Sequence, residues 1–176
     1  MRAPIKIQPV YSCVMLNHND IMSNMRTLGN HTQESYDVVA VGGSSLVLHG
    51  IKDSTKDVDF VVVYGDTMRF EMAYKEHCDG GLIDVSVAGE CFHTRLPSDY
   101  VGRSTYIDRF GQLTLRALSI PDVIITKATR SSERDLQDIR YCAIQVSADT
   151  VMERLRDYPE LHNNEKVIGT IKRGLG

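Results

Sequence analysis

Hydrophobic and polar residues along this chain repeat with two different periods, which separate strands from helices. Short apolar or alternating runs, typical of strands, are predicted at 37–41, 58–64, 82–87, 106–110 and 113–118. Helical spacing separates the first three runs, in a short segment that ends near Gly50 and again over residues 67–77. The last two runs flank Gly111 and Gln112, as in a hairpin. This order of elements predicts an α/β (α+β) fold.

Helical spacing alone follows from Ser119 onward. Predicted helices that begin at a capping residue cover 119–130, 132–144, a segment from Ser147 or Asp149 to 158, and 163–173. A further helix through Leu28 is capped by Asn17 or Asn19, whereas residues 1–16 show no clear period and stay unassigned. We therefore divide the chain into a core, residues 1–118, and a C-terminal helical portion, residues 119–176, packed on that core.

Composition narrows the class of protein. The formal charge of −3 and the pI near 6.0 argue against a protein that coats nucleic acid by bulk charge. No apolar stretch approaches the roughly 20 residues that span a bilayer, and the N-terminus lacks a continuous signal-peptide core. The four cysteines form no CxxC pair, which disfavours a zinc site and favours reduced thiols. We expect a cytoplasmic protein without a membrane partner.

Two aspartates stand where the second predicted strand begins. Asp57 and Asp59 are two residues apart, so on a strand they point the same way, about 6.6 Å apart along its axis. Their charges repel and each loses hydration at the edge of an apolar sheet, and a bound divalent cation relieves both costs. Carboxylate oxygens favour Mg²⁺ or Mn²⁺, and two metals that share carboxylates serve in-line nucleotidyl displacement. The pair therefore predicts a two-metal site.

A third acid, Asp84, is the candidate to complete this site. It lies on the next predicted strand, on the face opposite Ile83 and Val85. The alternative for Asp84 is an acid on the solvated face of a half-exposed strand.

The Gly42-Gly43-Ser44-Ser45 turn follows the first strand. Glycines let the backbone approach a ligand closely and adopt positive φ, and the N–H groups at the start of the next helix favour phosphate. Ser44 or Ser45 is expected to cap that helix. The turn lacks the lysine of a P-loop, so the alternative is an ordinary strand-to-helix turn.

The ordered set of these features resembles the nucleotidyltransferase superfamily related to DNA polymerase β. In that superfamily a Gly-Gly or Gly-Ser pair precedes an acid–apolar–acid strand by roughly a dozen residues, and a third acid follows on a later strand. The matching positions are Gly43-Ser44, Asp57-Val58-Asp59 and Asp84. The resemblance implies a small mixed β-sheet flanked by helices, with a C-terminal helical portion.

A second stretch, residues 118–139, resembles the small bacterial and archaeal nucleotidyltransferases that include abortive-infection toxins. The residues that carry this resemblance are Lys127, Arg130, Arg134, Asp135 and Asp138. Relatives often have an arginine two residues before the threonine of the T-x-D-x-D stretch, whereas this chain has Asp53 there, with Lys52 beside it.

The basic residues Lys127, Arg130 and Arg134 have two interpretations. In the first they form a positive wall for a triphosphate, and a solvated Lys127 points toward the glycine turn. In the second they occupy a solvated helix face, where Arg134 and Asp138 form a surface pair at i, i+4. His49, at the end of the short helix, is expected to pack or cap rather than act as a base.

We therefore expect a metal-dependent nucleotidyltransferase that moves a nucleoside monophosphate from a nucleoside triphosphate to an acceptor hydroxyl. Asp57, Asp59 and Asp84 are the expected catalytic and metal-binding residues, and the turn and the basic residues are the expected nucleotide contacts. The acceptor is open among RNA or tRNA, a protein side chain and a small molecule. The alternative is a nucleotide-binding or regulatory protein of the same fold without turnover, as in one half of a toxin–antitoxin pair.

Overall fold

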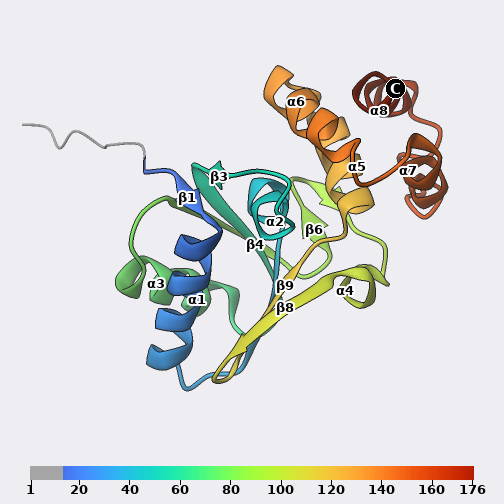
Figure 1. Cartoon of the computed structure of the whole chain (residues 1–176). Coiled ribbons are helices and arrows are strands. Elements are labelled where there is room, and N and C mark those ends of the chain that lie inside the picture. Colours follow the sequence, from blue (N-terminus) through green and yellow to red (C-terminus); the bar gives the residue numbers. More distant parts are fainter. Residues whose placement is uncertain (1–13) are drawn as a thin grey trace, which may run out of the picture.

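A five-stranded mixed sheet forms the centre of the protein (Figure 1). The computed structural model describes residues 14–176, so most of the unassigned N-terminal segment lies outside the described residues. The strands, in spatial order, are β5 (Leu82–Val87), β4 (Asp57–Tyr64), β2 (Tyr36–Ala40), β9 (Leu113–Ala117) and β8 (Thr105–Phe110). β4 runs parallel to β5 and antiparallel to β2, while β9 runs parallel to β2 and antiparallel to β8. The predicted α/β fold with a small mixed sheet is confirmed.

Helices account for most of the remaining chain. They are α1 (His18–His31), α2 (Gly42–Leu48), α3 (Thr67–His77), α4 (Tyr100–Arg103), α5 (Ile120–Arg130), α6 (Glu133–Cys142), α7 (Ala148–Leu155) and α8 (Glu165–Leu175). The N-caps of α1, α5, α6 and α7 are Asn17, Ser119, Ser132 and Ser147, so the first of the two predicted candidates caps both α1 and α7. The expected cap of α2 is wrong: this helix begins at Gly42 after Val41, and no side chain caps it.

Short elements that the hydrophobic pattern did not predict complete the structure. They are α4 and the two-residue strands β1 (Leu16–Asn17), β3 (Ser54–Thr55), β6 (Glu90–Cys91) and β7 (Thr94–Arg95). β6 and β7 pair as a hairpin between the third and fourth predicted strands. Two-residue strands are too short for a period to be visible in the sequence.

The sheet separates two hydrophobic layers. Successive residues of a strand point to opposite faces, so Val58 and Phe60 of β4 pack in the layer of α1 and α3, and Val61 packs in the layer of α5 to α8. In Figure 1 these two groups of helices lie on opposite sides of the sheet. Asp57 and Asp59 have the parity of Val61, and therefore face the side of α5 and α6.

The C-terminal helices share a hydrophobic layer with the sheet. Ile124 of α5, Ile139 of α6 and Ile171 of α8 belong to the same buried cluster as Val39 and Val61 of the sheet. The division of the chain at residue 118 stays a prediction. Within residues 14–176, no helix has both the length and the apolar character needed to cross a membrane.

Candidate active site

A cleft of about 370 Å³ lies where β4 begins, between the glycine turn and helices α5 and α6. It is lined by Gly43, Lys52, Thr55, Asp57, Asp59, Lys127, Arg130, Ser132, Arg134, Asp135 and Asp138. Residues far apart in the sequence thus meet in one place, and six of the ten predicted site residues are among them. The other four, Gly42, Ser44, Ser45 and Asp84, lie outside the lining.

Asp84 lies beside Asp59 on the neighbouring strand. The two residues are register partners of the parallel pair β4 and β5, so their side chains leave the sheet on the same face. The pKa of Asp59 is raised to about 6, first because the carboxyl is buried and then because the charges of Asp84 and Asp57 are close. This direction agrees with the expected repulsion between Asp57 and Asp59, and Asp84 adds to it.

The acids can supply two or three carboxylate ligands to a cation, but they do not surround it. Within residues 14–176 no group of three or more His, Cys, Asp or Glu side chains is already arranged to hold a metal ion. Mg²⁺ in phosphoryl-transfer sites is usually bound through one or two carboxylates together with water and substrate phosphates. Asp57 and Asp59, which point into the cleft, match this kind of open donor set.

The two glycines bring the start of α2 against the acids. A Cβ atom on Gly42, which has φ of +54°, would lie 2.9 Å from Asp59 Oδ2 and 2.9 Å from Phe92 Cζ. A Cβ atom on Gly43 would lie 2.7 Å from Thr55 Oγ1. A Cβ atom at either position would force these side chains to shift, and at Gly42 the positive φ disfavours any other residue as well.

The serines of the turn are buried and bonded to the backbone. Ser44 Oγ accepts a hydrogen bond of 3.0 Å from the Asp59 N–H and donates one of 3.4 Å to the Asp57 carbonyl. Ser45 Oγ donates to the Leu118 carbonyl at 2.8 Å, and His49 Nε2 lies 3.0 Å from the same carbonyl. The hydroxyls thus fix the acid strand and the helix in place, and His49 packs as expected.

Lys127 departs most from expectation. Its Nζ donates to Asp138 Oδ2 at 2.7 Å and to Asp135 Oδ1 at 3.3 Å, and only 3 % of the residue is exposed. The expectation of a solvated lysine is therefore wrong. The reason is that α6 folds back on α5 and aims two aspartates, three residues apart, at the last turns of α5.

Other cations complete this network around α6. Lys52 Nζ bonds to Asp138 Oδ1 at 2.8 Å, and Arg130 bonds to Asp135 Oδ1 at 2.6 Å. The pKa values of Asp135 and Asp138 are lowered, because hydrogen bonds and nearby positive charges, among them Lys127, outweigh the rise that burial causes.

Arg134 is an exposed cation of the cleft. Among residues 14–176 it forms no ion pair, and the expected surface pair between Arg134 and Asp138 is wrong because Asp138 is buried against Lys127 and Lys52. Its guanidinium group is therefore free to meet an anion.

Three residues near the acids were not predicted. Lys52 had been noted only as the neighbour of a missing arginine. Thr55 is buried and donates to the Asp57 carbonyl at 3.0 Å, a role that its place in the T-x-D-x-D stretch could have suggested. Phe92, whose ring centroid lies 4.0 Å from the Arg130 guanidinium carbon, gave no signal in the sequence.

Comparison with known proteins agrees with this geometry. Residues 17–167 match the model of a family described as "Nucleotidyltransferase of unknown function (DUF6036)". No curated protein and no solved structure matches the chain. The matched range includes the glycine turn, the three acids and the cations of α5 and α6, and it covers most of the chain. The chain therefore belongs to this family of nucleotidyltransferases of unknown function.

Proposed function

We propose that the protein transfers a nucleoside monophosphate from a nucleoside triphosphate to an acceptor hydroxyl, in a reaction that depends on Mg²⁺ or Mn²⁺. One observation carries this proposal: Asp57 and Asp59 face a cleft that also presents the Gly43 turn and the exposed Arg134, which forms no ion pair within residues 14–176. Carboxylates for a cation and a guanidinium group for a phosphate stand in one cavity, as phosphoryl transfer requires.

In this proposal Asp57 and Asp59 hold the two-metal site, and Asp84 contributes from the neighbouring strand. Metal ions held there would neutralise charge on the triphosphate and help to position the reacting oxygens. The raised pKa of Asp59, about 6, still leaves this carboxyl mostly ionised near pH 7, as a metal ligand must be.

The remaining residues orient the nucleotide. Gly43 and Arg134 contact the triphosphate, while Lys127 and Arg130 act from within the network of Asp135 and Asp138. The acceptor oxygen attacks the α-phosphorus, the bond from this phosphorus to the bridging oxygen breaks, and pyrophosphate leaves. Asp84 helps to take up the hydroxyl proton.

The test is Mg²⁺-dependent release of pyrophosphate from each of the four ribonucleoside triphosphates, with RNA, protein and small-molecule acceptors supplied in turn. The wild type should release pyrophosphate and label one acceptor class, and Asp57→Asn with Asp59→Asn should abolish the reaction. Asp53→Asn is the matched control, because Asp53 is exposed and lies outside the cleft. Equal turnover in the double variant would contradict the proposal.

A second candidate function is nucleotide binding without turnover, as a regulator or as one half of a toxin–antitoxin pair. The observation that favours it is the neutralisation of Lys127 and Arg130 by aspartates, which leaves fewer charges for a transition state. Magnesium-dependent nucleotide binding with no pyrophosphate release for any acceptor class would select this candidate.

A further inference from the structure

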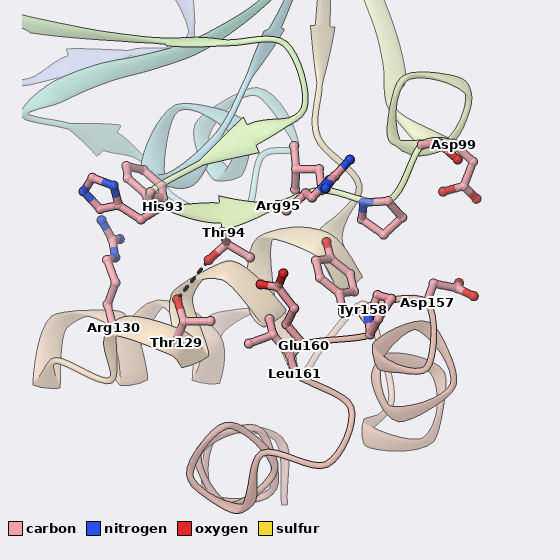
Figure 2. Close-up of a pocket in the computed structure, with 15 residues that line it drawn as sticks. His93, Thr94, Arg95, Asp99, Thr129, Arg130, Asp157, Tyr158, Glu160 and Leu161 are labelled. Atoms are coloured by element: carbon pink, nitrogen blue, oxygen red, sulfur yellow. Dashed lines mark hydrogen bonds between the residues drawn. The ribbon is translucent and has the colours of Figure 1, made fainter.

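A second and larger cavity, of about 840 Å³, adjoins the acid cleft (Figure 2). It lies between the β6–β7 hairpin, the end of α5 and the segment that connects α7 to α8. Its lining is Phe92, His93, Thr94, Arg95, Leu96, Pro97, Ser98, Asp99, Thr129, Arg130, Asp157, Tyr158, Pro159, Glu160 and Leu161. The volume is in the range of small-molecule sites, roughly 300–1,000 Å³.

Arg130 and Phe92 join the two cavities. Arg130 lines both of them, and its guanidinium carbon lies 4.0 Å from the centroid of the Phe92 ring. The same ring flanks Gly42 together with the carboxylate of Asp59. A molecule in the larger cavity would therefore have one end beside the acids.

The backbone is strained at the two residues that lie where the two cavities meet. Phe92 and His93, the two residues between β6 and β7, have φ values of 49° and 62°. A two-residue hairpin with positive φ at both positions normally uses Asn-Gly, and a bulky residue there costs on the order of 1–2 kcal/mol. Strain of this kind is characteristic of functional sites, and here it lies at two lining residues, of which Phe92 has its ring beside Gly42 and the carboxylate of Asp59.

The charges of the cavity show what it accepts. Asp99 and Asp157 lie at the end away from Arg130, and Glu160 points into the space between (Figure 2). Buried Arg154 contacts both Asp99 and Asp157 at 2.9 Å, but it is also paired with the buried Asp122.

Carboxylates therefore exceed cations along this wall. The lining has three carboxylates, those of Asp99, Asp157 and Glu160, against two arginines, Arg95 and Arg130; Arg130 is paired with Asp135, and Arg103 adds its charge near Asp99 from outside the lining. Nucleic acid needs an excess of Lys and Arg against its phosphates, so this cavity disfavours it. An ammonium group suits it.

We propose that the larger cavity is the acceptor site and that the acceptor is a small hydroxyl-bearing amine. Its ammonium group lies among Asp99, Asp157 and Glu160, and its hydroxyl group points past Phe92 toward Asp59. The assignment of the amine as the acceptor rests on the proposed nucleotidyl transfer. The prediction that the cavity binds the amine does not depend on that reaction.

Binding is tested on the full chain without nucleotide, by NMR titration of backbone amides. The probes are glucosamine, N-acetylglucosamine, which has the same sugar but no charge on nitrogen, and a short single-stranded RNA. Glucosamine should shift the signals of residues 92–99 and 157–161, and the acetylated sugar should bind about fivefold more weakly, as expected for loss of one exposed ion pair. Equal binding of the two sugars, no shift with glucosamine, or RNA binding at these residues would overturn the proposal.

Two variants test whether the carboxylate of Glu160 contributes to binding of the ammonium group. Glu160→Gln should weaken glucosamine about threefold, and Glu153→Gln, which removes an exposed carboxylate outside the cavity, should change nothing. Equal effects of the two variants would contradict the site. Pyrophosphate release is measured separately: its absence together with intact glucosamine binding would refute the proposed function and leave the amine site standing.

Discussion

Two pairs of aspartates face the same cleft, and the structure treats them differently. Asp57 and Asp59 on β4 form no ion pair among the described residues, and burial and mutual repulsion raise the pKa of Asp59. Asp135 and Asp138 on α6 meet Lys127, Arg130 and Lys52, and their pKa values are lowered.

The difference distinguishes carboxylates that are compensated by Lys or Arg within the protein from carboxylates that are not. A buried acid with its own cations belongs to the scaffold, because removing either partner leaves an uncompensated charge. A buried acid beside other acids is held at a cost to the fold, and that cost is typical of a site completed by a bound cation. The sequence alone does not reveal this difference, because each pair consists of two aspartates that lie only two or three residues apart.

The largest effect is expected from Lys127→Ala. Because Lys127 is buried against two carboxylates, its loss should lower the free energy of unfolding by about 3–5 kcal/mol, measured by urea denaturation. Lys56→Ala is the matched control: Lys56 is exposed, and its loss should change stability by less than about 0.5 kcal/mol. Similar small effects in both variants would show that the network on α6 is not structural.

Arg134→Ala should act on the ligand and leave the fold unchanged. A charged contact to the triphosphate is worth about 1.5–3 kcal/mol, so nucleotide affinity should fall roughly ten- to hundredfold, measured by calorimetry at one salt concentration. Arg140→Ala, an exposed arginine of the same helix outside the cleft, should bind nucleotide normally. An Arg134 variant with wild-type affinity would remove this residue from the site.

Asp59 and the pair on α6 should give opposite pH dependences of stability. The lowered pKa values of Asp135 and Asp138 add stability that is complete above the unfolded value, near 3.9, and is lost as pH falls through the folded values. The folded pKa of Asp59 is raised, so its favourable contribution exists at low pH and is lost as pH rises from about 4 to about 6. Melting temperatures from pH 3 to 7 should thus show Asp59→Asn gaining on the wild type by about 2–4 °C over that upper range. Parallel curves for the two proteins would contradict this account.

The smallest effect on stability is expected where function is lost completely. Asp57→Asn with Asp59→Asn should leave the free energy of unfolding at pH 7 unchanged or raise it by up to about 1 kcal/mol, because the substitution relieves repulsion. Urea denaturation of the double variant beside Asp53→Asn measures this. A loss of several kcal/mol would show that the acid pair is structural.

Much of the fold could be predicted because hydrophobic residues recur with a clear period along its main strands and helices. β4 has a continuous apolar run after Asp59, and α5 and α6 begin directly after Ser119 and Ser132, whose side chains cap them. The β6–β7 hairpin was not predictable, since Phe92 and His93 occupy a turn that usually requires Asn or Gly. Tertiary contacts there override local preference.

The candidate site also contains some residues that the sequence predicts and others that it does not. Asp57 and Asp59 could be placed on one face of a strand from spacing alone, because strand parity acts locally, whereas Gly43 was assigned through the resemblance of the ordered motifs. The burial of Lys127 could not, since it depends on how α6 folds back onto α5, and the sequence does not show that angle. The cavity behind Phe92 is likewise assembled from three segments distant in the chain.

The hydroxyl of Ser44 affects how relatives of this protein are to be interpreted. It bonds to the backbone at both Asp57 and Asp59 and is fully buried, so replacing it with alanine leaves an amide and a carbonyl without that partner whether or not the protein is an enzyme. A descendant that had lost all activity would still be under selection to keep this serine. Its presence in a related sequence therefore marks an intact fold, whereas under the proposed function the two carboxylates that it holds in place are the residues to examine for loss of activity.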